Sequence, residues 1–229
     1  KVNVKTNFTL QDSKVNSVYE GLNEVGIGNG NYAITGYPAF MFKLTDYNRD
    51  PQGHVIVDAK TGYPSQNPTP VMFGRTMPKY IFGVNPSFEY KSFTLTVTAD
   101  YRAGHQVYHG IGPDMDFTGI SGRSGENGRM RFVMPNSVYD DGTGKYVTNT
   151  DVLVRAGGYG FYEATATNRG INSNYITSAA AWKIREIALT YDVPAAAMRK
   201  AKFVKGASVG LVARNVFTFL PSSNQWTDP

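Results

Sequence analysis

Residues 80–101 read YIFGVNPSFEYKSFTLTVTADY, and this stretch decides the fold. Apolar side chains alternate with polar or small ones, which is typical of a strand with two different faces. The break at Lys91-Ser92 divides the stretch into two arms joined by a very short turn. Each arm has about 10–12 residues, more than a usual strand and enough for a tilted strand to cross a bilayer. The stretch therefore predicts a long antiparallel hairpin with an apolar face and a wet face.

Aromatic residues gather near both ends of the apolar face of this hairpin. Tyr80 and Phe82 stand at one level, and Tyr90 and Phe93 stand at the other. These are the levels at which a membrane barrel carries its interfacial aromatic girdles. We therefore expect the following membrane-facing or girdle residues: Tyr80, Phe82, Phe88, Tyr90, Phe93, Leu95, Val97 and Tyr101. The alternative is a soluble β-sandwich that binds carbohydrate, in which the same rows would be buried against a second sheet.

The same alternation recurs, less regularly, in four other segments of the chain. Together with the hairpin they predict six strands, at about 2–11, 32–44, 80–91, 93–104, 180–193 and 207–219. Six strands cannot close a barrel with a wide lumen, because the diameter grows with strand number and plugged transporters use about 22 strands. The fold class expected is thus all-β: an antiparallel transmembrane β-barrel segment that needs partner strands from the rest of its polypeptide.

The connections between these strands differ strongly in length. The turn at 91–92 is minimal and the link at 194–206 is short, with one helical turn expected near its start, whereas the connections at 45–79 and 105–179 are very long. Loops longer than about 15 residues are uncommon in compact domains and are usually functional. Short turns on one side and long loops on the other are typical of outer-membrane barrels. Placing the short turns in the periplasm puts the 12–31 link there as well.

The composition fits a sheet with one apolar and one wet face. Aromatic residues make up 13% of the chain while the mean hydropathy is −0.33, and charged residues are only 18%, below the usual share of about 25%. The net charge of +5 is spread along the chain, so no clustered basic patch indicates nucleic-acid binding. The absence of Cys excludes disulfides, thiolate zinc sites and Cys nucleophiles.

Membrane insertion through a helix is not expected from this sequence. It contains no apolar run of 18 residues, which leaves a closed barrel as the other way to span a bilayer. The first residues lack the apolar region of a signal peptide. We therefore expect both ends of the sequence to fall inside a longer polypeptide.

Two groups of side chains invite a metal-site hypothesis. His105 and His109, with Asp114 and Asp116, offer imidazole and carboxylate ligands. They stand in a Gly-rich stretch in which no helix is expected, so a spacing of four residues has no geometric meaning there. We expect no metal at this site.

The second group resembles the start of a calcium-binding loop. Asp46, Asn48 and Asp50 have the spacing of its first ligands, but Pro51 and Val57 stand where that motif needs Gly and Glu. A turn is the preferred interpretation. No catalytic triad, nucleophile elbow or dinucleotide fingerprint is complete, so we expect no catalytic residue, no cofactor and no enzymatic activity.

The 105–179 connection is rich in Asn, Tyr, Arg and Gly, residues that contact glycans or peptides by stacking and hydrogen bonding. Its candidate substrate-binding residues are Tyr159, Phe161, Tyr162, Arg169, Asn172 and Asn174. The alternative for each of them is ordinary packing within the loops at the mouth of the barrel.

Five segments, in order along the chain, resemble motifs of the SusC/RagA family of TonB-dependent outer-membrane transporters. These are TGYPAF at 35–40, GRTMPKYIFG with FEYKSFTL at 74–83 and 88–95, AWKIREIALTYDVP at 181–194, LVARNVFTF at 211–219 and NQWTDP at 224–229. One such motif would be weak, but five in family order are specific. Trp182 departs from the pattern, because Tyr or Leu is common at that position.

The resemblance implies that residues 1–229 are part of the C-terminal portion of a receptor barrel, roughly strands 16–21 of about 22. The plug domain, the TonB-contact segment and the final strand would lie outside it. The partners implied are the rest of the barrel and its plug, a SusD-like surface lipoprotein, TonB acting through the plug, outer-membrane lipid, and a glycan or peptide substrate. The location implied is the outer membrane, and the function is nutrient uptake.

Overall fold

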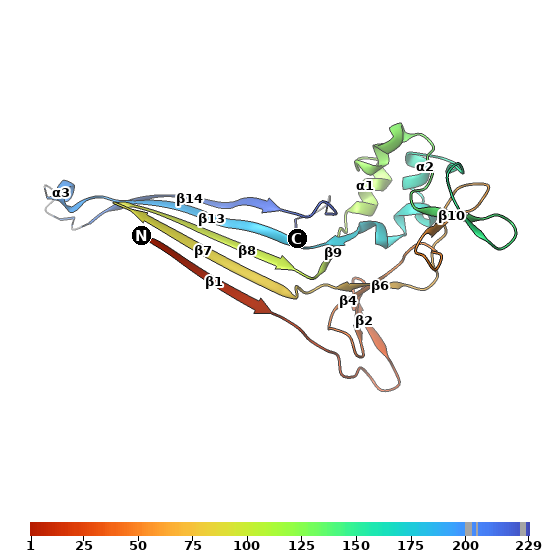
Figure 1. Ribbon diagram of the computed structural model, residues 1–229, viewed down its shortest axis with the longest axis horizontal. Coiled ribbons are helices and arrows are strands. Elements are labelled where there is room, and N and C mark those ends of the chain that lie inside the picture. The colour runs from red at the N-terminus through yellow and green to blue at the C-terminus, as the bar shows by residue number, and fades with distance from the viewer. Residues whose placement is uncertain (200–202, 205, 225–227) are drawn as a thin grey trace. The chain divides into compact units, whose positions relative to one another are not determined.

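The computed structural model describes residues 1–199, 203–204, 206–224 and 228–229 (Figure 1). The chain divides into two compact units. The sheet unit comprises Lys1–Ser13, Met77–His105 and Ser178–Pro229, and the loop unit comprises Lys14–Thr76 and Gln106–Thr177. Parts of the expected 194–206 link and of the 224–229 motif lie outside the described residues. In the described part of the chain, no helix is both long and apolar enough to cross a membrane.

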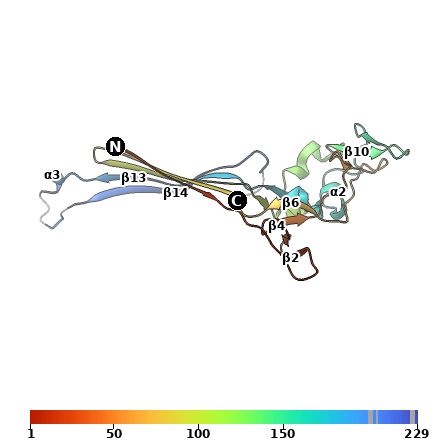
Figure 2. The same cartoon turned by 60° about the horizontal axis from the view of Figure 1, so that its bottom comes forward.

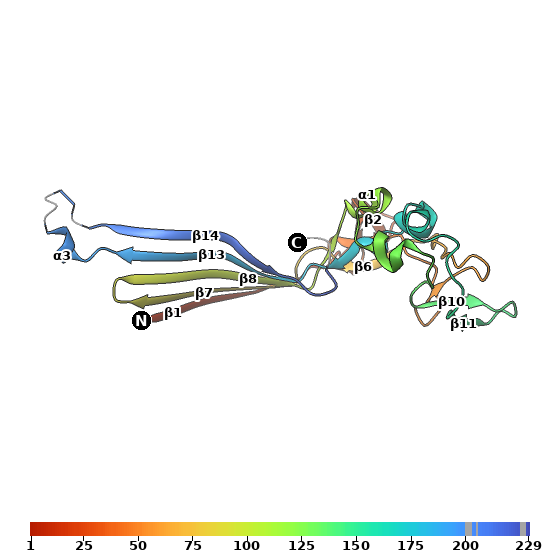
Figure 3. The ribbon, with the colours of Figure 1, turned by 90° about the horizontal axis from the view of Figure 1, so that it is seen from above.

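The sheet unit contains one five-stranded antiparallel sheet with the order β1-β7-β8-β13-β14 (Figure 3). Its strands are β1 (Val2–Leu10), β7 (Tyr80–Tyr90), β8 (Phe93–Ala103), β13 (Ala181–Asp192) and β14 (Ser208–Phe219). Four of them have 11 or 12 residues. The predicted hairpin is confirmed, because Tyr90 pairs with Phe93 across the turn at Lys91-Ser92. Lys91 has a φ of +53°, in the left-handed region that tight hairpin turns require.

The register of the five strands creates two chemically different faces. Residues directly opposite each other in an antiparallel sheet point to the same side. One row across the sheet joins Val2, Phe88, Leu95, Leu189 and Leu211, and another joins Phe8, Phe82, Tyr101, Trp182 and Phe219. The row on the other face next to the first joins Asn3, Ser87, Thr96, Ala188 and Val212. One face, called the apolar face below, is therefore continuous across all five strands, and the other, the wet face, is mostly polar or small.

A β-bulge at Arg185 keeps the apolar face continuous. Ile184 pairs with Ala99 and Ile187 pairs with Val97, so three steps along β13 span two steps along β8. If β13 alternated regularly through Arg185, with no bulge, Trp182 and Ile184 would point to the side opposite Ile187. The alternation of the sequence did not predict this bulge.

The expected strand 32–44 is wrong. The segment forms two short strands, β3 (Asn31–Ile34) and β4 (Met41–Leu44), which belong to a sheet of the loop unit with the order β2-β3-β4-β6. Between them the chain turns: the Tyr37 N–H donates to the Ile34 carbonyl, and Gly36 has a φ of +89°. The other two strands of this sheet are β2 (Glu24–Gly28) and β6 (Val71–Arg75). The six expected strands become a five-stranded sheet because β1 pairs directly with β7.

The 12–31 link was expected in the periplasm, on the side of the short turns. This position is wrong, because β1 pairs directly with β7. β1 ends at Leu10, which pairs with Tyr80 at the start of β7, and the Gln11 N–H donates to the Lys79 carbonyl. The chain therefore leaves β1 at the end of the sheet where the long connections begin and return, called the loop end below. The turn at Lys91-Ser92 lies at the opposite end, called the turn end. The link between β13 and β14 contains α3 (Ala195–Met198), as expected of a single helical turn (Figure 2).

The two long connections are not open loops but part of a folded unit. They contain β5 (Val55–Ile56), β10 (Ser137–Asp140) and β11 (Tyr146–Thr148) in one small sheet, in which β10 and β5 are parallel. A second pair consists of β9 (Gln106–Tyr108) and β12 (Ile176–Ser178). The helical elements are α1 (Gly112–Thr118), α2 (Tyr159–Tyr162) and short helical turns at Arg123–Arg129, Thr165–Arg169 and Asn172–Tyr175.

Two small hydrophobic clusters hold the loop unit together. One contains Tyr47, Val55, Val57 and Ile171, and the other contains Val154, Phe161 and Tyr162. Met134 packs against both. The expectation that no helix lies near His109 is wrong, because α1 begins at Gly112 with Pro113 in its first turn, a position that suits proline.

Candidate functional site

The apolar face of the sheet is the first candidate surface. All eight side chains expected to face a membrane lie on it, as the strand register shows. Phe88 is 43% exposed and Tyr90 is 72% exposed, while Leu95 and Val97 are half-buried. β1 and β14 add further exposed apolar side chains, such as Leu211. Within the described residues of the sheet unit, these five strands form a single layer, which does not match the β-sandwich alternative.

Aromatic side chains form a belt at each end of the apolar face. At the loop end, Trp182 stacks on Tyr101 with ring centroids 5.1 Å apart and meets Phe82 edge-on at 6.0 Å. At the turn end, Phe93 and Tyr191 lie 4.7 Å apart, and Lys91 lies over Tyr90. The sequence reasoning missed the belt residues Phe8, Trp182, Tyr191, Phe217 and Phe219. The alternation within strands 2–11, 180–193 and 207–219 carried the signal for most of them.

The wet face carries charges that pair across strands. Arg185 of β13 donates to Asp100 of β8 through Nε and through Nη2, the latter at 3.1 Å, and Arg102 lies 3.3 Å from the same carboxylate. Arg214 of β14 donates to Glu186 of β13 at 3.1 Å. Charged groups in these positions need water or partners, so this face suits an aqueous environment and not a hydrocarbon one.

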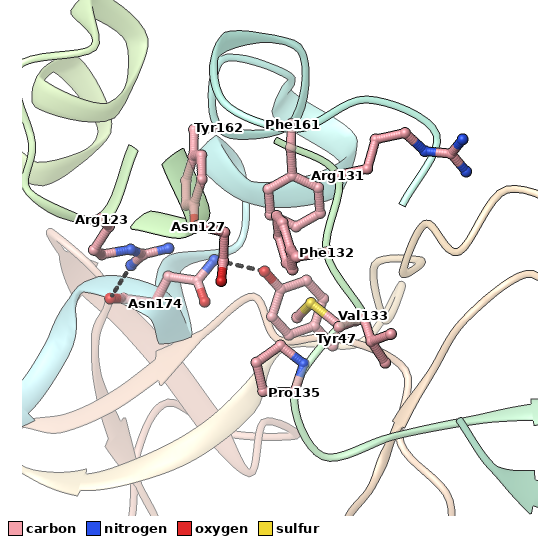
Figure 4. Close-up of a pocket in the computed structure, with 11 residues that line it drawn as sticks. Tyr47, Arg123, Asn127, Arg131, Phe132, Val133, Pro135, Phe161, Tyr162 and Asn174 are labelled. Carbon is pink, nitrogen blue, oxygen red and sulfur yellow. Dashed lines mark hydrogen bonds between the residues drawn. The ribbon is translucent and has the colours of Figure 1, made fainter. Parts of the chain in front are cut away.

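A pocket of about 410 Å³ in the loop unit is the second candidate site (Figure 4). Of the expected substrate-binding residues, Phe161, Tyr162 and Asn174 line it. Tyr159 is exposed, Arg169 lies over the Phe117 ring, and Asn172 accepts a hydrogen bond from Tyr108, all outside the lining. Lining residues that sequence reasoning missed are Tyr47, Arg123, Asn127 and the segment 131–135. They come from distant parts of the chain, so no local pattern indicated them.

A buried polar network adjoins this pocket through Arg123, which belongs to both. Asp116 of α1 is fully buried and accepts hydrogen bonds from Tyr175 at 2.7 Å and Asn168 at 2.8 Å, as well as one from Ser121. Arg123 lies 3.8 Å from the same carboxylate and donates to the Asn168 side chain at 2.6 Å. The network therefore supplies the partners that a buried carboxylate needs.

Arg123 connects the network to the pocket. Its guanidinium lies between the rings of Tyr162 and Tyr175, about 5.5 Å from each centroid, in a cation–π arrangement. Arg123 also donates to the backbone carbonyl of Asn174. The side-chain amide of Asn174 in turn donates to the Tyr47 hydroxyl at 2.8 Å (Figure 4). These contacts hold Arg123, Tyr47 and Asn174 in fixed positions around the cavity.

Burial raises the pKa of Tyr47, which lines the pocket, and of Tyr175, which belongs to the network. It raises the pKa of Tyr47 to about 12. Burial, together with the hydrogen bond to Asp116, also raises the pKa of Tyr175 above its ordinary value. Like ordinary tyrosines, both are neutral hydrogen-bonding groups at neutral pH, and the raised pKa extends that state to more alkaline pH.

Strained backbone begins at Asn127, one of the residues that line the pocket. Asn127, Gly128 and Arg129 have φ values of +54°, +61° and +61° in succession. Left-handed backbone costs an L-residue about 1–2 kcal/mol. The following segment lies so close to Gly157 that an added Cβ there would come within 1.9 Å of the Met130 carbonyl oxygen. Such a close approach requires glycine at position 157.

The carboxylates considered as metal ligands are occupied by protein donors. Asp46 binds Arg49 at 2.8 and 3.1 Å and Ser173 at 2.7 Å, and Asp50 lies 2.8 Å from His54. Burial acts to raise the pKa of Asp46, but the hydrogen bonds from Arg49 and Ser173 outweigh it and hold that pKa below its ordinary value. Among the residues that the structure describes, no group of three or more His, Asp or Glu side chains could hold a metal.

Comparisons with known proteins bear on the fold. No family model and no curated protein matches the sequence. Similar solved structures include the RagAB peptide transporter, with 18% identity, a TM-score of 0.63, and coverage of 95% of this chain and 23% of that chain. The RagAB peptide importer in its "closed-closed" state shows 19% identity, a TM-score of 0.63, and coverage of 97% and 24%. The same importer in its "open-open" state shows 18% identity and a TM-score of 0.61, with coverage of 97% of this chain and 23% of that chain.

This chain therefore spans about a quarter of the length of the solved chains it resembles. At this level of identity the likeness establishes the fold. It shows nothing beyond the fold, because the identity is below 20%.

Proposed function

We propose that this chain forms part of the wall and of the loops of an outer-membrane β-barrel importer of large nutrients, peptides or glycans. Residues 1–229 would be a C-terminal portion of a TonB-dependent transporter, with the plug and the remaining strands supplied by the rest of the polypeptide. No bond is made or broken in this function. The observation that carries the proposal is the continuous apolar face of the sheet, opposite a face of paired charges.

The exposure of the apolar face supports contact with lipid. A soluble monomer rarely exposes a contiguous apolar patch larger than a few hundred Å². Here apolar rows run across five strands, and large side chains on β1, β7 and β14 are exposed. In lipid these rows would be surrounded by hydrocarbon instead of water. The three inner strands β7, β8 and β13 pair with a neighbour on both sides, whereas β1 and β14 each pair on one side only.

The distance between the aromatic belts supports a membrane span. Ten residues separate Tyr80 from Tyr90 along β7, which corresponds to about 33 Å at about 3.3 Å per residue. A strand tilted by about 40° covers about 25 Å of depth over that length, equal to the height of the apolar band in outer-membrane barrels. The two belts would then lie at the two interfaces of one bilayer.

The two outer strands of the sheet support a larger assembly. Among the described residues, β1 pairs only with β7 and β14 only with β13, so each leaves one row of backbone groups open. Open edges of long strands are prone to pair with further strands. Neighbouring barrel strands would close both edges and satisfy these groups.

The partners follow from this role. A SusD-like surface lipoprotein would cover the mouth of the barrel formed in part by the loop unit, and TonB would act through the plug. The solved RagAB structures are of a peptide transporter, which supports peptides as one class of cargo. The paired charges of the wet face would line the lumen.

Fractionation of cells that express the complete polypeptide tests the proposal. We expect the protein in the outer-membrane fraction, extracted only by detergent, and a gene deletion should abolish uptake of fluorescent peptides or oligosaccharides. Co-purification of a surface lipoprotein would support the partner assignment. Recovery of the complete protein from the aqueous fraction without detergent would refute the barrel role.

A further inference from the structure

The pocket of the loop unit combines apolar walls with neutral polar groups. Phe132 and Phe161 meet edge to face at 5.0 Å, and Phe161 and Tyr162 do so at 5.2 Å. Met134 and Pro135 continue the apolar lining. Figure 4 shows Phe132 and Phe161 grouped on one side and Arg123, Asn127 and Asn174 on the other. A ligand that fits must therefore carry an apolar part and a polar part close together.

Three of the polar groups are available for a ligand. In the described part of the chain, the Asn127 side chain, the Tyr162 hydroxyl and the Asn174 Oδ1 atom have no hydrogen-bond partner in the protein. None of them is a buried orphan atom, since all three reach solvent in the pocket. Together they offer both donors and acceptors, which is what the N–H and C=O groups of a peptide main chain require.

The two arginines that line the pocket already have acceptors in the protein, so neither is set up to bind an anionic ligand. Arg123 already lies beside Asp116 and donates to Asn168 and Asn174. The Arg131 guanidinium donates to the carbonyls of Leu153 and Val154 and points away from the other lining side chains (Figure 4). A sugar ligand is disfavoured for a different reason. Among the described residues that line the pocket there is no Asp or Glu, so it lacks carboxylates that would bind sugar hydroxyl groups.

The size of the pocket limits how much of a ligand it holds. Sites for whole small molecules have volumes of about 300–1,000 Å³, and this pocket is near the lower end at about 410 Å³. The cavity suits one side chain with its adjoining main chain, and not a long polymer.

We infer that this pocket binds one apolar side chain of an extended peptide, with Asn127, Tyr162 and the Asn174 Oδ1 atom bonding the adjacent main chain. The inference rests on the proposed import function and names the peptide class that the importer selects. The left-handed turn at 127–129 positions Asn127 in the lining of the pocket, where its amide would meet the main chain of the peptide.

A photo-crosslinking experiment on the complete transporter, purified in detergent, tests this directly. The probe is a ten-residue Gly/Ser peptide with one central photoleucine, a leucine analogue of similar size and polarity. We expect crosslinks within segments 123–135 and 161–174. The same peptide with a central Leu should compete at least about tenfold better than one with a central Asp, since burying a Leu side chain is worth about 1.5–3 kcal/mol.

A matched pair of variants isolates the contribution of the pocket. Asn127→Gly removes one amide where the left-handed backbone already suits glycine, and we expect about two- to tenfold weaker binding of the Leu peptide. Asn29→Gly is the control, because Asn29 also has a left-handed backbone (φ +49°) but lies outside the pocket lining. It should bind the peptide as the wild type does.

The outcomes separate the two proposals. Crosslinks outside the two segments, or equal competition by the Leu and Asp peptides, would overturn the pocket inference while peptide uptake by cells stayed intact. If the complete transporter neither bound nor imported any peptide, peptide import and the pocket inference would fail together, whereas the outer-membrane location would be judged by fractionation alone.

Discussion

Placing a charge at the middle of the apolar face should destabilise the complete barrel strongly. Val97 is the site of choice, because it lies four residues from Phe93 at one belt and four from Tyr101 at the other. Four residues correspond to about 13 Å along the strand and to about 10 Å of depth at a tilt of about 40°. Val97 therefore lies near the midplane of the proposed membrane, where a charge has its largest effect.

The expected magnitude follows from that depth. An Arg on the lipid face at the midplane of a barrel costs about 2–4 kcal/mol, so Val97→Arg should lower the folding equilibrium constant by about 30- to 700-fold, at about 1.4 kcal/mol per tenfold. Thr98→Arg is the matched control. Thr98 is the next residue of the same strand, has nearly the same shape as valine, and points to the wet face beside Glu186, where a new cation gains a partner.

The assay is reversible denaturant unfolding of the complete protein in phospholipid vesicles, followed by tryptophan fluorescence. We expect a large loss of unfolding free energy for Val97→Arg and a change within about 1 kcal/mol for Thr98→Arg. Equal effects of the two substitutions, or a larger effect of Thr98→Arg, would refute the assignment of the faces.

Three further predictions address the loop unit and the wet face. Gly157→Ala should expose segment 129–132 to proteolysis, because its Cβ would collide with the Met130 carbonyl, whereas Gly125→Ala, with open space around its Cβ, should leave the protease pattern unchanged. The pKa of Asp46 is lowered in the folded state, so its contribution to stability is complete above the unfolded pKa of about 3.8 and is lost as pH falls through the lower folded pKa. In the wild type, hydrogen exchange near residue 46 should accelerate as pH falls through this range. Asp46→Asn should remove this acceleration. A double-mutant cycle of Asp100→Asn and Arg185→Met should give a coupling energy of about 1–2 kcal/mol for this half-buried, two-bond ion pair, and a value near zero would contradict its role on the wet face.

The strands that the sequence predicted share a local property. In strands 2–11, 80–91, 93–104 and 207–219, apolar and polar side chains alternate within the segment itself, and the structure places strands there with boundaries within one or two residues. The period of two follows from the geometry of an extended backbone. It therefore identifies a two-faced strand before any partner strand is known.

The failures of the sequence reasoning occurred where the chain departs from that geometry. The segment 32–44 contains Gly36 and Pro38, which mark turns, and its apolar residues do not alternate regularly. The turn between β3 and β4 breaks the expected strand, and β1 then pairs with a strand about 80 residues later. A loop was expected where α1 forms. The succession Gly112-Pro113-Asp114 was a local signal of a helix start, because proline and an acidic residue favour the first turn of a helix.

The sequence by itself determined that this chain forms long two-faced strands with aromatic residues near their ends. Only the tertiary structure decided the register and the pocket. The bulge at Arg185 aligns Trp182 with Tyr101, and the polar network beside the pocket brings Asp116 to Tyr175 and Arg123 to Asn174, residues more than 50 positions apart. The physical reason is that alternation is imposed on each strand by its own backbone, whereas register and cavity walls depend on contacts between residues that no local pattern connects.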